Sequence, residues 1–122
     1  MDQKDLKART KRFALLILRL ADDLPNTMKG RAVAGQIIRA GTSVAANYRA
    51  ACRSRSKSEF ISKLGTVIEE SDESAFWLEL IEEDGMLEAD RVVPLWREAC
   101  ELVAIMTQSR KTAETNLRAR KS

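Results

Sequence analysis

The sequence contains no histidine, and this absence excludes several kinds of catalytic and metal site. Ser-His-Asp and Cys-His catalysis need an imidazole to carry the proton, and the usual His-bearing zinc and di-iron sites need it as a ligand. The two cysteines, Cys52 and Cys100, are too far apart to form a Cys-x-x-Cys motif, so we expect both to be reduced and buried. We therefore expect a non-enzymatic protein with no catalytic residues, no metal and no cofactor.

Glycine and proline are also scarce, with 5 and 2 occurrences in 122 residues. An all-β fold would need turn signals roughly every 8–12 residues, so this class is nearly excluded. The longest apolar run, from Phe13 to Leu18, is too short to span a bilayer. Because the start of the chain, from Met1 to Asp5, is polar and acidic, we do not expect it to act as a secretory signal. We expect one cytoplasmic domain over residues 1–122, with no membrane association.

Apolar residues recur at helical spacing along four segments. These predict helices over about 5–23, 29–53, 57–84 and from about 89 onward. Because the loops between them are short, the expected fold is all-α, an antiparallel up-down-up-down four-helix bundle. The expected core stripes are Phe13, Ile17, Leu20 and Leu24; then Val33, Ile37, Ala40, Val44, Tyr48 and Ala51; then Phe60, Leu64, Val67, Ser71, Ala75 and Leu78; and finally Val92, Trp96, Ala99, Val103 and Met106.

Local signals mark the ends of the third helix and the last residues of the chain. Ser56, with Glu59 three residues later, has the pattern of a capping box, and Gly85 is expected to end the helix in the left-handed conformation. Residues 112–122 lack an apolar stripe, so we expect them to be frayed or disordered.

Charge is distributed unevenly along the chain, although the net charge is only +3. Residues 1–63 hold 14 Lys and Arg against 5 Asp and Glu, residues 64–107 hold 2 against 12, and residues 108–122 hold 5 against 1. Two interpretations remain open. Basic and acidic helices pair with each other, within one chain or between copies, or the basic segments form a surface for nucleic acid.

Some basic residues share a bearing on the outside of the second helix. Arg31 and Arg49 are 18 residues apart, which is five helical turns, and Arg53 is one turn further on. Such a row suits phosphate contact, because polyanion binding needs several cations together. No aromatic residues are interleaved with it, so base stacking is weakly supported. The candidate nucleic-acid-binding residues are Lys11, Arg12, Arg31, Arg49, Arg53, Arg55 and Lys57.

Other outward positions are apolar or small. Ala34, Ile38 and Ala45 lie off the core stripe of the second helix, and Phe76 and Leu80 lie among the acidic residues of the third. Several such residues on two helices favour a subunit interface over scattered surface hydrophobes.

Two adjacent segments, QIIRAGTSVAANYR from Gln36 to Arg49 and ACRSRSKSEFISKL from Ala51 to Leu64, carry a resemblance to a known family. Glu70 and the residues from Trp77 to Leu80 extend it. The chain, up to about Ser109, resembles the four-helix bundle proteins encoded in intervening sequences of bacterial 23S ribosomal RNA genes.

The resemblance implies a small bundle that assembles as a homopentamer, with no assigned biochemical role. Related bundles are accessory factors of retroelements that bind nucleic acid and associate with a reverse transcriptase. The implied partners are therefore further copies of the chain, RNA or DNA, and a reverse transcriptase or another protein. The family pattern includes Arg39, which we interpret as an inter-helix or inter-subunit position and add to the candidate interface. Two functions remain: nucleic-acid binding by an oligomeric module, or a protein-interaction scaffold without nucleic acid.

Overall fold

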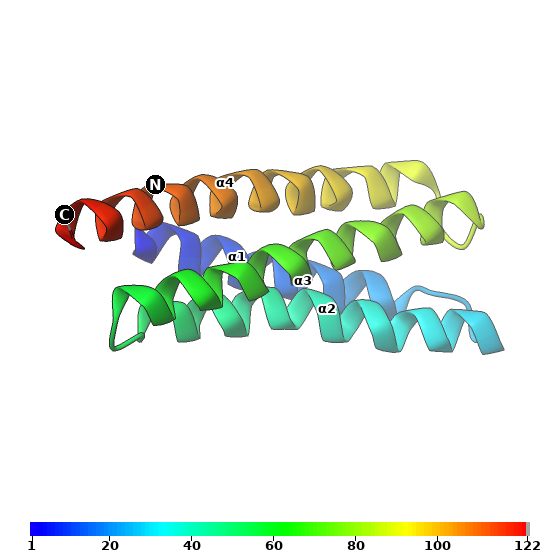
Figure 1. Ribbon diagram of the computed structural model, residues 1–122. Coiled ribbons are helices and arrows are strands. Elements are labelled where there is room, and N and C mark those ends of the chain that lie inside the picture. Colours follow the sequence, from blue (N-terminus) through cyan, green and yellow to red (C-terminus); the bar gives the residue numbers. More distant parts are fainter. Residues whose placement is uncertain (122) are drawn as a thin grey trace.

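The structure is a computed structural model that describes residues 1–121. In that range the chain forms helices α1 (Gln3–Asp22), α2 (Met28–Cys52), α3 (Lys57–Glu83) and α4 (Ala89–Lys121). Successive helices run antiparallel and pack side by side, and both termini lie at the same end as the loop between α2 and α3 (Figure 1). The predicted all-α bundle is confirmed.

Each of the first three helices begins at a residue whose side chain accepts a backbone N–H. Thr27 caps α2, and Ser56 Oγ accepts the N–H of Glu59 at 3.0 Å to cap α3. The Glu59 carboxylate accepts the N–H of Arg55 at 3.1 Å, so the predicted reciprocal bond to Ser56 is replaced by one to the residue before it. A full capping box occurs instead at the start of α1, between Asp2 and Asp5, which sequence reasoning did not identify.

The end of α3 matches the prediction. Gly85 has a φ of 77°, the left-handed conformation that glycine adopts without steric cost. The N–H of Met86 donates to the carbonyl of Ile81 at 2.9 Å, and the N–H of Gly85 donates to that of Glu82 at 3.0 Å. These are the two hydrogen bonds of a Schellman motif, which satisfy carbonyls left open at the end of the helix.

The core contains most of the predicted stripe residues, with one clear error on α4. Trp96 was expected to face inward, but it is exposed, and its indole N–H donates to the Glu79 carboxylate at 2.8 Å. Leu95, the residue before it, is buried in its place, and further along α4 Leu102 is buried beside Val103, a predicted core residue that is half-buried. The polar N–H of the indole explains the difference, because a carboxylate at the surface can satisfy it and a dry core cannot.

The expectation of a frayed or disordered end over residues 112–122 is wrong for residues 112–121. Helix α4 continues through them to Lys121, and Ala113 is buried. Ala113 lines a shallow pocket together with Leu6 of α1 and Phe60 of α3, so the last turns of α4 rest on both neighbours. Ser122 lies outside the described residues.

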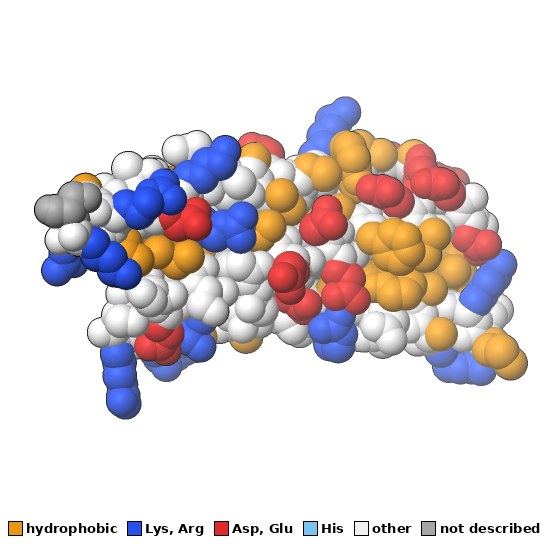
Figure 2. Space-filling view, in the orientation of Figure 1, with side chains coloured by type: hydrophobic (Ala, Val, Ile, Leu, Met, Phe, Trp, Pro, Cys, Tyr) orange, Lys and Arg blue, Asp and Glu red, His pale blue; other side chains and the backbone are white. Residues whose placement is uncertain are grey.

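Charge is separated along the bundle axis. The face in Figure 2 carries most of its Lys and Arg toward the end with the termini and most of its Asp and Glu over the other part. The antiparallel topology produces this separation, because it brings the basic ends of α2 and α4 to the same end of the bundle.

Candidate nucleic-acid interface

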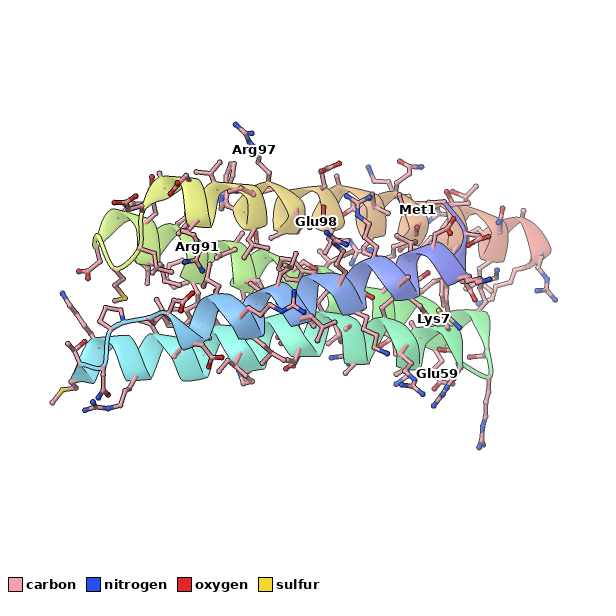
Figure 3. The ribbon with its side chains drawn as sticks, turned by 180° about the vertical axis from the view of Figure 1, so that it is seen from behind. Met1, Lys7, Glu59, Arg91, Arg97 and Glu98 are labelled. Carbon is pink, nitrogen blue, oxygen red and sulfur yellow. The ribbon has the colours of Figure 1, made fainter. Side chains whose placement is uncertain are left out.

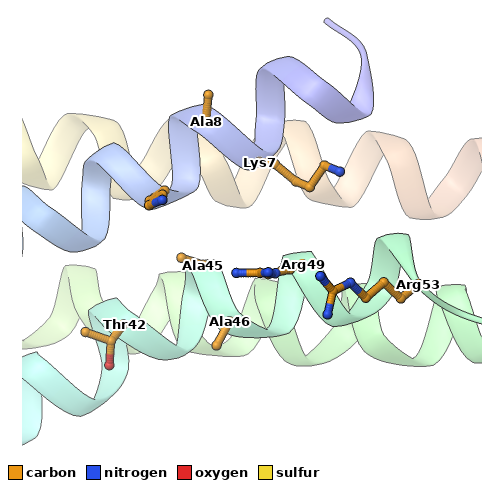
Figure 4. Close-up of a pocket in the computed structure, with 8 residues that line it drawn as sticks. Lys7, Ala8, Thr42, Ala45, Ala46, Arg49 and Arg53 are labelled. Atoms are coloured by element: carbon orange, nitrogen blue, oxygen red, sulfur yellow. The ribbon is translucent and has the colours of Figure 1, made fainter.

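A groove of about 630 Å³ runs between α1 and α2 (Figure 4). Lys7 and Lys11, one turn apart on α1, face Arg49 and Arg53, one turn apart on α2. Small side chains complete the lining: Ala8, Thr42, Ala45 and Ala46. We call this feature the α1–α2 groove.

The small residues of α2 explain why α1 and α2 pack closely beneath an open groove. Gly41 is buried and faces Ile17, and a Cβ atom at Gly41 would lie 2.8 Å from Ile17 Cγ2. One residue further on, the Thr42 hydroxyl donates to the Ile38 carbonyl at 2.7 Å. The helices therefore meet at Gly41, and short side chains above this contact leave the groove open.

The described residues form no ion pair that neutralises the charge of the groove. No ion pair formed by residues 1–121 includes Lys7, Lys11, Arg49 or Arg53. The ion pairs that do form link other helix faces: Arg9 with Glu98 and Glu101, Lys29 with Asp84, Arg39 with Glu70 and Glu73, and Arg91 with Asp23. The groove thus holds four cations without a carboxylate partner in the described chain, which is the arrangement that attracts a polyanion.

Arg39 has a different environment from the groove cations. Its guanidinium bridges α2 to Glu70 and Glu73 of α3. The hydrogen bond from Arg39 lowers the pKa of the Glu73 carboxyl, and the indole N–H of Trp77, 3.3 Å away, acts in the same direction. Arg39 therefore serves as an inter-helix link inside one chain.

The structure does not bring all seven predicted nucleic-acid-binding residues together. Lys11, Arg49 and Arg53 share the groove. Arg12 lies on another side of α1, where it lines a pocket with Pro94 of α4. Arg31 is near the opposite end of α2 and donates to Asn26 at 2.9 Å. The remaining two, Arg55 and Lys57, lie at the corner between α2 and α3.

The predicted interface residues are also divided. Phe76 and Leu80 are 49% and 37% exposed on α3, and the Phe76 ring contacts Trp77 edge-on with a centroid distance of 5.2 Å. Ala34 and Ile38 are half-buried against the core, and Ala45 lines the α1–α2 groove. Sequence reasoning missed the exposed Leu15 and Leu18 of α1, which lie off the core stripe of that helix. Helical periodicity directs Leu15 and Leu18 away from Phe13 and Ile17, and this pattern could have identified them as surface residues.

Two further findings concern metal and membrane. Within residues 1–121, no three Asp, Glu or Cys side chains are grouped so that they could hold a metal ion. None of the helices described combines the length and apolar character needed to cross a bilayer.

Comparison with known proteins adds a family and a structural relative. The profile of the family described as "23S rRNA-intervening sequence protein" matches residues 3–108. The structure is similar, with a TM-score of 0.84, to the crystal structure of a protein of unknown function from the S23 ribosomal protein family of Bacteroides thetaiotaomicron VPI-5482. The two sequences are 29% identical, and the match covers 91% of this chain and 99% of that chain. Among curated proteins, none matches significantly.

Proposed function

The chain belongs to the family of 23S rRNA-intervening sequence proteins, and on that basis we propose that it is a non-enzymatic, cytoplasmic, oligomeric module that binds nucleic acid through α1 and α2. The observation that carries this proposal is the α1–α2 groove, which holds four cations with no carboxylate partner among residues 1–121. Ion-paired cations such as Arg9 and Arg39 must lose an existing partner before they contact phosphate, whereas the groove cations need not.

The lining of the groove favours contact with the phosphate backbone. Among the described residues no aromatic side chain lines it, so it offers no platform for base stacking. Lys and Arg side chains that contact phosphate fix the position of a nucleic acid without reading its sequence. We therefore expect binding to depend on salt and to differ little between sequences.

A salt-dependent titration tests this function. Fluorescence anisotropy with a labelled DNA hairpin should show binding at low salt that weakens as salt increases. Replacing Arg49 and Arg53 by Ala should flatten the slope of log affinity against log salt by up to about 1.8, because each lost phosphate contact removes about 0.9. The matched control is Arg19→Ala with Arg97→Ala, which removes the same charge outside the groove; both residues are exposed, and neither forms an ion pair within residues 1–121.

Two outcomes would contradict the proposal. A parent protein with no affinity for the hairpin at any salt concentration would leave the scaffold function in its place. Equal losses in the groove variant and the control variant would show that net charge, and not the groove, determines binding.

We further propose that copies of the chain assemble through the outer face of α3. Phe76 and Leu80 support this proposal, because they are one turn apart and both are exposed among acidic residues. The pentamer is the expected assembly because of the family resemblance. The same family resemblance is the reason to test a reverse transcriptase or another protein as a partner.

A further inference from the structure

A second cationic cleft lies at the end of the bundle that carries the termini. Arg55 and Lys57, from the corner between α2 and α3, line it together with Arg120 and Lys121 from the last turn of α4. Its volume is about 540 Å³. We call it the end cleft.

The end cleft exists because α4 remains helical to Lys121. Leu117, one turn before Lys121, lines the cleft on the side of α4, and Ser56 and Ser58 line it on the side of α3. No ion pair within residues 1–121 includes its four cations. The nearby Glu59 carboxylate accepts the Arg55 N–H and is not part of the lining. The cleft therefore carries positive charge that the described chain leaves uncompensated.

The end cleft and the α1–α2 groove come near each other at the corner between α2 and α3. Arg53 lines the groove and Arg55 lines the cleft, and two residues of chain span at most about 7 Å. From Thr42 to Arg53 the groove follows α2 for about 16 Å, at about 1.5 Å per residue. One strand of B-DNA advances about 3.4 Å per phosphate, so the groove alone matches about five phosphates. The groove lies between α1 and α2 and the cleft between the start of α3 and the end of α4, so a longer strand reaches the cleft by passing over the corner that carries Arg53 and Arg55.

We propose that the end cleft is a second phosphate-binding site for the same nucleic-acid molecule, so that Arg120 and Lys121 extend the binding surface beyond the groove. This inference rests on the proposed nucleic-acid binding. It adds that the number of contacts depends on the length of the bound nucleic acid. The groove and the step to Arg55 together span about 23 Å, or about seven phosphates, so a ligand of about five or six base pairs fills the groove and a ligand longer than about seven also reaches the cleft.

Ligand length provides the test. We would compare two labelled DNA hairpins, with stems of 6 and 16 base pairs, by anisotropy over a salt series with the full-length chain. Arg120→Gln with Lys121→Gln should flatten the salt slope for the long stem by about 1.8 and leave the slope for the short stem unchanged. Arg49→Ala with Arg53→Ala should weaken the binding of both stems.

The control variant replaces Arg97 and Lys111 of α4 by Gln. Both are exposed, and Arg97 projects from α4 away from the other helices (Figure 3). This double variant removes the same charge from α4 as the end-cleft variant. The salt slopes for the short and the long stem should both equal those of the parent. Circular dichroism of each variant checks that α4 is retained.

Each outcome bears on the inference. If the end-cleft variant binds the long stem with the slope of the parent, the inference is wrong and the groove function stands. If the end-cleft variant weakens both stems equally, length does not matter and the inference is again wrong. If the parent binds neither stem at any salt, the proposed function and the inference fail together.

Discussion

Gly41 of α2 packs closely against Ile17 of α1, and its substitution tests how tightly this contact is fixed. A Cβ atom at Gly41 would lie 2.8–3.0 Å from three atoms of Ile17, including its Cβ, and Ile17 is fully buried. We expect Gly41→Ala to lower the free energy of unfolding, because overpacking costs about 1–3 kcal/mol. The higher helix propensity of Ala offsets about 1 kcal/mol of this loss. Denaturant unfolding followed by circular dichroism measures the change.

Gly35, in the same helix, is the matched control. A Cβ atom there would meet nothing within 4 Å. Gly35→Ala should therefore raise the free energy of unfolding by about 0.5–1 kcal/mol. If both substitutions stabilised the protein, α1 would not pack against Gly41 as described.

At the scale of the helix, the start of α3 depends on the Ser56 side chain. Ser56→Ala should lower the free energy of unfolding by roughly 1 kcal/mol, because the Glu59 N–H loses its acceptor. Glu59→Ala should cost somewhat less, since its carboxylate accepts one N–H, that of Arg55, in an exposed position. Thermal melts of both variants measure this, with Ser58→Ala as the control. Melts identical to the parent would show that the cap contributes nothing.

Helix boundaries were predictable from the sequence where local chemistry sets them. Ser56 and Gly85 act within a few residues of their own positions, and both were identified from the sequence. The end of α4 was not, because the burial of Ala113 depends on residues of α1 and α3 that only the tertiary structure brings near it. With Ala113 as their one buried residue, residues 112–121 show no apolar stripe in the sequence.

The candidate groove was predictable only in part, because it depends both on helical periodicity and on how two helices pack. Helical periodicity placed Arg49 and Arg53 on one bearing, and the structure keeps them together. Periodicity could not tell which side of α1 faces α2. Arg12 was predicted together with Lys11 because both are basic residues of the first helix, but the two line different pockets on different sides of that helix.

At the scale of the whole molecule, Phe76 tests whether copies assemble through α3. We expect the parent to be larger than the 13.7 kDa monomer in light scattering at micromolar concentration. Phe76→Glu should shift it toward the monomer, because a carboxylate would be added to an acidic surface and an exposed ring removed. Circular dichroism should be unchanged, since Phe76 lies outside the core cluster.

Met28→Glu serves as the control for assembly. Met28 is 83% exposed at the first position of α2, where an acidic side chain suits the helix dipole. Its assembly should match that of the parent. A parent that scatters as a clean monomer would rule out the proposed interface.

The separation of charge along the bundle gives the molecule a permanent electric dipole close to its long axis. In the field of a polyanion, such a dipole experiences a torque that turns the basic end forward before any contact forms. The protein then searches fewer orientations per collision, so productive encounters become more frequent. Because the field is screened beyond about 10 Å at 0.1 M salt, this orienting effect is confined to the last stage of approach. Added salt would thus slow the encounter itself as well as weaken the complex.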